Sequence, residues 1–202
     1  KIVHGSDERT EFGICFIDTS LGSIFIGQFE DDRHKSELRT LLAHYPPAHV
    51  LLKKSVYEET RNIVNCMAAT ALIDYLASDV EFLNAVETLK TIHESDYFGK
   101  LDENKATEWP ETLVEATDFK DLWTPKSDSE LALSAFGACL WYLRKSKLDL
   151  QVLCTKNIKP YTPHCGLTPA NPQANLQSVH MVLDATTLAN LDVVSNADTG
   201  NK

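Results

Sequence analysis

Two apolar runs near the start of the chain, at residues 12–18 and 23–29, are separated by the polar turn Thr-Ser-Leu-Gly. The first run is apolar at successive positions, which is typical of a strand buried on both faces. Thr19 and Ser20 can hydrogen-bond the local backbone, and Gly22 tolerates a positive φ. The pattern therefore predicts a β-hairpin made of the two runs, with Asp18 opening its turn.

A helix is expected directly after the hairpin. Asp31 or Asp32 can cap its first turn, and Pro46-Pro47 ends it after about Tyr45. Its apolar residues recur at helical spacing and share one face: Leu38, Leu41 and Leu42.

Strand and helix patterns then alternate. We expect a strand at residues 48–54, a helix at 55–69, a strand at 70–76 and a helix at 82–98. The residues expected to point inward from the two helices are Ile63, Val64 and Met67, then Leu83, Val86, Leu89 and Ile92. Residues 131–143 are apolar all round, which indicates a helix buried on most sides. Ser127 and Glu130 have the spacing of a capping box before it.

Four segments lack this regularity. Residues 1–11 are typical of a linker, and 99–126 are polar and interrupted by proline, although Trp109, Leu113, Phe119 and Trp123 could attach them to a surface. Residues 155–177 contain four prolines and are predicted to be a loop. Residues 178–202 start a new element, in which Asp184 could cap a helix bearing Leu188 and Leu191.

The order of elements indicates an α/β fold. An antiparallel hairpin that feeds βαβ units, with helices on both sides of one mixed sheet, is the arrangement of ribonuclease H-like folds. The main domain then covers residues 12–154, and residues 178–202 belong to the next one.

That fold gives Asp18 a possible catalytic role, because its nucleases hold two divalent metal ions between carboxylates from the first strand, the first helix and the next strand. Glu37 could supply the second carboxylate. Lys53-Lys54 stands where the third is needed, and a cation there opposes metal binding. We therefore favour Asp18 as a turn residue that bonds nearby amides, and keep a metal-dependent nuclease using Asp18 and Glu37 as the alternative.

Composition narrows the function further. The chain has 202 residues and a net charge of −10, which repels nucleic acid and anionic membranes except at local basic clusters such as Arg144 to Lys147. No apolar run is long enough to span a membrane, and the chain starts without Met, as expected for a segment of a longer protein. The odd number of cysteines, five, indicates free thiols in a cytosolic or nuclear protein. No phosphate-binding loop, nucleophile elbow or HExxH motif occurs, so no cofactor or metal site is predicted.

Three stretches carry a family resemblance over about residues 11–194. They are FGICFIDTSLGSIFIGQFEDDRHKSELRTLLAHYPP, SELALSAFGACLWYLRKSKLD and MVLDATTLANLDVV. The first two resemble the connector domain of eukaryotic MutS mismatch repair proteins, and the third resembles the start of their core, or lever, domain. Within the family the chain is most similar to the larger subunit of the heterodimer that recognises base mismatches.

The resemblance implies a non-enzymatic, nuclear domain that relays movement between the mismatch-reading and ATPase domains. It implies no cofactor in this segment, whereas the full-length protein uses ATP and Mg²⁺. The implied partners are other domains of the same chain, MutS homologue two, MutL-type proteins and, through the full protein, mismatched DNA, with no membrane. We expect structural or interface roles for Asp18, Thr19, Ser20, Asp31, Asp32, Arg33, His34, His44, Tyr45, Pro46 and Pro47.

Overall fold

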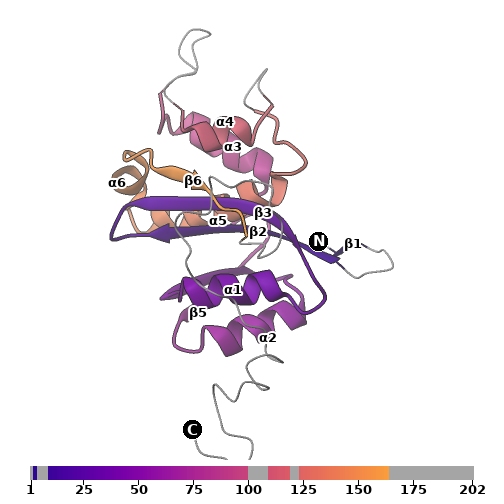
Figure 1. Cartoon of the computed structure of the whole chain (residues 1–202). Coiled ribbons are helices and arrows are strands. Elements are labelled where there is room, and N and C mark those ends of the chain that lie inside the picture. Colours follow the sequence, from indigo (N-terminus) through magenta and orange to yellow (C-terminus); the bar gives the residue numbers. More distant parts are fainter. Residues whose placement is uncertain (1, 4–8, 100–108, 119–122, 164–202) are drawn as a thin grey trace, which may run out of the picture. The chain divides into compact units, whose positions relative to one another are not determined.

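A four-stranded mixed sheet forms the centre of the computed structural model, which describes residues 2–3, 9–99, 109–118 and 123–163 (Figure 1). Its strand order is β1-β2-β3-β6. The strands are β1 (Ile2–Val3), β2 (Arg9–Asp18), β3 (Ser23–Asp31) and β6 (Ile158–Pro160). β1, β2 and β3 pair antiparallel in sequence, whereas β6 runs parallel to β3.

The long β2–β3 hairpin confirms the first prediction from the sequence. Its register pairs Phe16 with Phe25 on one face and Cys15 with Ile26 on the other, ending with Asp18 opposite Ser23. Successive side chains of a strand point to opposite faces, so an uninterrupted apolar run places hydrophobic groups on both. The hairpin can therefore be packed from two sides.

The predicted strands near residues 50 and 73 are also confirmed, but they form a separate sheet. β4 (His49–Lys53) and β5 (Leu72–Leu76) pair in parallel and are joined by α2 (Glu58–Met67). Among the described residues, hydrogen bonding divides the strands between two sheets, instead of the one mixed sheet expected. The observed fold is mixed α/β, with a small mixed sheet flanked by helices.

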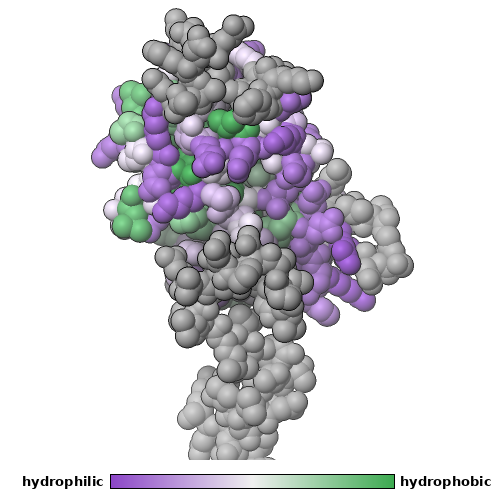
Figure 2. Space-filling model, turned by 45° about the horizontal axis from the view of Figure 1, so that its top comes forward, coloured by the Kyte–Doolittle hydropathy of each residue, from purple (hydrophilic) through white to green (hydrophobic). Residues whose placement is uncertain are grey.

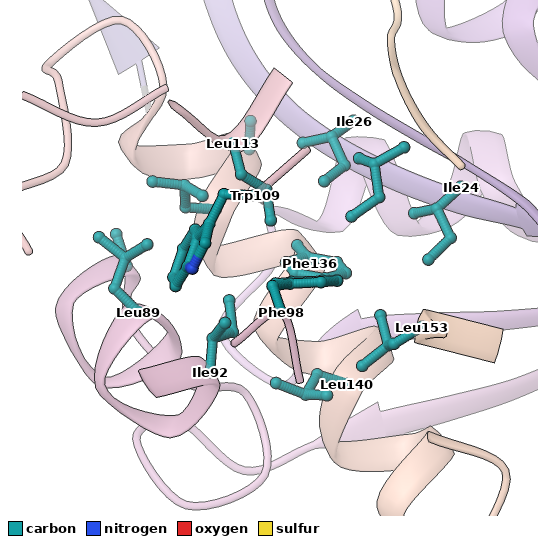
Figure 3. Packing of buried hydrophobic residues seen from close by; sticks show 14 residues of the cluster. Ile24, Ile26, Leu89, Ile92, Phe98, Trp109, Leu113, Phe136, Leu140 and Leu153 are labelled. Atoms are coloured by element: carbon teal, nitrogen blue, oxygen red, sulfur yellow. The ribbon is translucent and has the colours of Figure 1, made fainter. Parts of the chain in front are cut away.

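Four helices contribute to the core on one face of the hairpin. They are α3 (Ala85–Glu94), α4 (Glu111–Glu115), α5 (Glu130–Lys145) and α6 (Asp149–Leu153). Phe98, Leu89 and Phe136 are at most 1% exposed there, next to Ile24 and Ile26 of β3 (Figure 3). The all-round apolar run of α5 is explained by this position, because the helix contacts both the sheet and α3.

The other face of the hairpin has its own core. α1 (Ser36–His44) and α2 pack Leu38, Leu41, Leu42, Ile63 and Val64 against the aromatic residues of β2 and β3. The three leucines predicted for the inward face of α1 are all buried. The hairpin therefore lies between two hydrophobic clusters, one on each face.

Several predictions of local structure were wrong. Met67 and Val86 are 39% and 54% exposed, because the buried stripes of α2 and α3 are narrower than the apolar spacing suggested. The polar stretch around residue 113 is not irregular throughout, because it contains α4; its predicted attachment is confirmed, since Trp109 and Leu113 are buried and the Trp123 ring stacks on that of His93. The predicted loop from residue 155 includes β6, because Ile158–Pro160 complete the edge of the main sheet.

The expected capping box at Ser127 is also absent: the N-cap of α5 is Ser129, without a side-chain cap of its own. The predictions for Phe119, Asp184, Leu188 and Leu191, and those for most of residues 1–8 and all of 164–202, lie outside the described residues.

No helix in the described part of the chain combines the length and apolar character that crossing a membrane requires.

Candidate functional site

The turn end of the hairpin holds the first group of candidate residues. The Asp18 carboxylate accepts hydrogen bonds from the backbone amides of Ser20 (2.9 Å) and Leu21 (3.3 Å). Thr19 and Ser20 are exposed. This is the arrangement in which an aspartate replaces a backbone acceptor and closes a turn, as the sequence predicted.

The nuclease alternative fails on geometry. Glu37 lies at the other end of the hairpin, where its backbone amide donates to the Asp31 carboxylate (3.1 Å). The length of β3 separates that end from the turn, about 26 Å at the usual rise per residue. The end of β4, where a nuclease would need its third carboxylate, carries Lys53 instead. The ammonium of Lys53 lies 5.9 Å from the centre of the Phe82 ring. Among the described residues, no three His, Cys, Asp or Glu side chains are placed to hold a metal ion.

The open end of the hairpin is organised by Asp31, which is only 3% exposed. Its carboxylate accepts hydrogen bonds from the backbone amides of Asp32 (2.8 Å), Glu37 (3.1 Å) and Leu38 (3.0 Å). The first amides of a helix have no partner within the helix, so a carboxylate there satisfies them and interacts favourably with the helix dipole. Asp31 thus caps α1 from the end of β3.

Asp32 provides a second cap. Its carboxylate accepts from the Ser36 amide (3.0 Å) and the Ser36 hydroxyl (2.8 Å). Partial burial alone would raise the pKa of Asp32, but these hydrogen bonds, with His34 nearby, outweigh it and lower the pKa below its ordinary value. Both predicted caps therefore act, although α1 begins at Ser36 rather than directly after them.

The residues between the caps and the helix form a tight connection. Lys35 has a left-handed backbone, with a φ of 55°. Its ammonium donates to the carbonyls of Asp32 (3.1 Å) and Arg33 (3.4 Å), which leaves the residue 4% exposed. Arg33 and His34 are exposed on the outside of this connection. They form a surface held in one shape by the buried lysine and the two carboxylates.

The end of α1 holds the third group of candidates. His44 is the last helical residue, and the exposed Pro46 and half-buried Pro47 follow it. The Tyr45 ring is 44% exposed, yet its centre lies 4.8 Å from that of Phe16. Phe16 in turn stacks on Phe25, so Tyr45 anchors the end of α1 over the aromatic face of the hairpin.

Tyr161, directly after β6, joins these aromatic residues. Its burial, with the negative charges of Glu37, Tyr45 and Asp31 in its surroundings, raises its pKa to about 12. Its hydroxyl is therefore neutral at physiological pH. The predicted residues as a whole lie in three groups along the hairpin and α1, and the described structure does not bring them together into one catalytic centre.

Sequence reasoning missed the residue that fixes the start of α5. The side-chain oxygen of Gln28, on β3, accepts hydrogen bonds from the amides of Leu131 (2.7 Å) and Ala132 (3.2 Å). The same side chain donates to Glu11 (2.8 Å). No local motif could have shown this, because the cap and the helix are about a hundred residues apart in the chain.

A pair of cysteines was likewise not predicted. The Cys139 thiol donates to the carbonyl of Cys15 (3.8 Å), across the contact between α5 and β2. Burial and the neighbouring Cys139 raise the pKa of Cys15 well above its ordinary value. The Cys15 thiol is therefore a packing group rather than a nucleophile.

Residues 2–156 match the family model described as MutS domain II. The chain belongs to the MutS family. It is 40% identical to the human DNA mismatch repair protein Msh6 over 97% of its length, and 36% identical over 93% to the probable Msh6 of Drosophila melanogaster. It is 32% identical over 94% to MSH6 of Saccharomyces cerevisiae.

These relatives are much longer than the chain, which spans about 15% of the human protein. The match to MutS domain II and the identity with Msh6 proteins confirm the resemblance to the connector domain and to the larger, Msh6-type subunit. The match covers both the hairpin with its capped α1 and the late helix α5.

Proposed function

We propose that the chain is the non-catalytic connector segment of a nuclear DNA mismatch repair protein, relaying movement between mismatch-binding and ATPase domains. The observation that carries this proposal is the MutS domain II match over residues 2–156. The separation of Asp18 from Glu37 supports the non-catalytic part. ATP and Mg²⁺ would be bound by other parts of the full-length protein, which makes the ATPase a property of that protein and not of this segment.

The packing of the hairpin supports a relay. Both faces of β2 and β3 lie against hydrophobic clusters, one with α1 and α2 and one with α3 to α6. Close-packed interiors transmit displacement instead of absorbing it. Force applied at α1 would therefore reach α5 through the hairpin. We further propose that the fold is ribonuclease H-like, because the hairpin is followed by a β4-α2-β5 unit, although β4 and β5 pair with each other and not with the main sheet.

The connection before α1 is the surface we propose for MutL-type partners. Arg33 and His34 are exposed there on a connection fixed by Asp31, Asp32 and Lys35. Surfaces that are held in shape before binding lose less entropy when a partner docks. MutS homologue two, as the heterodimer partner, and mismatched DNA would be engaged by the full protein.

The test of the relay assignment uses labelled matched and mismatched duplexes. Their fluorescence anisotropy is followed with the 202-residue chain at low and physiological salt, with and without Mg²⁺. We expect no binding, or weak binding that salt removes equally for both duplexes, because the net charge is −10. Mismatch-selective binding that survives salt would contradict the assignment, and Mg²⁺-dependent loss of the duplex would revive the nuclease alternative.

The partner assignment has its own test. A MutL-type protein should be retained by the immobilised chain, and Arg33→Glu should abolish that retention. Lys54→Glu, an exposed charge reversal at the end of β4, is the matched control. Equal retention by both variants would remove the proposed surface.

A further inference from the structure

A groove lies between helices α3 and α5. It is separate from the candidate residues at the hairpin turn and around α1. Its volume is about 320 Å³, and it is lined by Leu83, Thr91, Leu140, Trp141, Arg144 and Lys145. Leu140 is fully buried at its base, whereas Trp141 and Leu83 are half-buried. The groove thus presents an apolar floor with an indole that is only partly covered.

One side of this groove is cationic. Arg144 and Lys145 are exposed in the last turn of α5, and Lys147 follows shortly after. The ammonium of Lys145 lies 4.8 Å from the centre of the Trp141 ring, so it stands directly beside the floor. None of the ion pairs Arg9–Glu30, His49–Asp74 and Lys90–Glu87, in the described part of the chain, involves these cations.

We propose that the α3–α5 groove binds an acidic amphipathic helix of a partner protein. The apolar stripe of such a helix would cover Leu83 and Trp141, and carboxylates along one flank would meet Arg144 and Lys145. Partly covered tryptophan and arginine side chains are the groups that contribute most at protein interfaces. The opposite charges would also orient the helix in the groove.

The same charges favour a protein over a nucleic acid. A duplex presents one negative charge about every 1.7 Å along its whole length, many more than the few exposed cations at this end of α5 can neutralise. A few carboxylates beside an apolar stripe match the small cationic side and the apolar floor together. The proposal goes beyond the connector role, because it rests on the residues that line the groove and not on a role in mismatch repair.

Figure 2 shows mostly hydrophilic side chains on the described part of one face, with hydrophobic groups in small separate patches.

The test uses a labelled synthetic helix of about 18 residues, long enough to fold partly alone, with leucines on one stripe and glutamates along its flank. Its affinity for the full chain is measured by fluorescence anisotropy. We expect binding that weakens about tenfold or more when lysines replace the glutamates, because the cationic side would then repel the probe. No binding of the glutamate probe overturns the proposal.

Two variants separate the groove from charge alone. Arg144→Glu with Lys145→Glu should weaken binding about tenfold or more. Thr91→Arg adds a cation but fills the groove, so it should weaken binding equally if the floor is used, and strengthen it if only charge matters. Circular dichroism checks that each variant folds. If the double variant does not fold, Thr91→Arg alone distinguishes use of the groove from attraction by charge.

Lys54→Glu with Lys159→Glu is the matched control, since it makes the same change in charge at exposed positions elsewhere. It should leave the affinity for the probe unchanged. Equal losses in the control and the groove variants would overturn the proposal. Binding of matched duplex DNA that is lost with Arg144→Glu and Lys145→Glu, but kept with Thr91→Arg, would assign the cations to nucleic acid instead. Because Arg33→Glu acts only on the surface proposed for MutL-type proteins, the two proposals can fail separately.

Discussion

Helices α1 and α5 both begin against strand β3, but their first amides are satisfied from very different distances along the chain. Asp31 and Asp32 cap α1 from positions only four to seven residues before the amides that they bind. Gln28 caps α5 from about a hundred residues away. The two starts show that equivalent hydrogen bonds can come from a local motif or from the assembled sheet.

The start of α5 also depends on a close backbone approach. Gly13 lies opposite Gln28 in the hairpin register, and a Cβ at Gly13 would overlap the backbone of Leu131. The helix therefore sits directly on β2 while Gln28 of β3 caps it. The caps of α1 come from its own local segment, whereas the cap of α5 needs a hairpin that is already formed.

The largest effect should come from Gly13→Ala. Because the obstructing atoms belong to the Leu131 backbone and cannot rotate away, we expect a loss of about 3 kcal/mol in the free energy of unfolding. Urea denaturation measures it. Gly22→Ala is the control: it has a φ of +60° and only a side chain nearby, so it should cost about 1 kcal/mol. Equal losses at the two glycines would mean that the close approach is not important.

Asp31→Ala tests the local cap and should cost about 2 kcal/mol, since three backbone amides lose their buried acceptor. Asp31→Asn keeps one acceptor oxygen and should lose less. Denaturation in urea gives both values. Asp128→Ala, an exposed acid before α5, should change stability by less than about 0.5 kcal/mol. A loss at Asp31 no larger than that at Asp128 would contradict the capping role.

Gln28→Ala tests the distant cap, with an expected loss of about 1 kcal/mol. Hydrogen exchange should locate the effect, because the amides of Leu131 and Ala132 lose their acceptor. Gln28→Glu in a Glu11→Gln background retains an acceptor without placing two carboxylates together, and should restore protection of these amides. Unchanged exchange in Gln28→Ala would show that α5 is held by packing alone.

The smallest effect concerns Asp32 and pH. Its pKa is lower in the folded chain, so its contribution to stability is present above the unfolded pKa of about 3.9 and is lost as pH falls through the folded pKa. Wild type and Asp32→Asn should differ at pH 6 and converge toward pH 3. The difference should stay under about 1 kcal/mol, because solvent screens this exposed carboxylate. A difference that grows on acidification would contradict the assignment.

Much of the fold was predictable from local patterns. The hairpin, the leucine face of α1, the β4 and β5 strands and the buried α5 follow from the spacing of apolar residues and from turn chemistry. The turn role of Asp18 was predicted for the same reason, since the amides that donate to its carboxylate are only two and three residues away in the chain. Short-range physics decides such features before the chain is packed.

The failures involve partners that are distant in sequence. Ser127 has the spacing of a capping residue, but α5 begins only at Glu130, and the amides of Leu131 and Ala132 in its first turn donate to Gln28. Ile158–Pro160 read as a loop because a three-residue strand carries almost no pattern, and only its pairing with β3 makes it one. The groove between α3 and α5 likewise arises from two helices whose order in the sequence says nothing of their spacing.

The sequence by itself determined the hairpin, the β4 and β5 strands and the longer helices, where α1 is capped, and that Lys53 rather than a carboxylate ends β4. Tertiary structure alone decided that Asp18 and Glu37 lie at opposite ends of the hairpin, and that Gln28 and Gly13 receive α5. The reason is physical. Periodicity and turn chemistry act over a few residues, whereas the distance between two side chains depends on how whole elements pack.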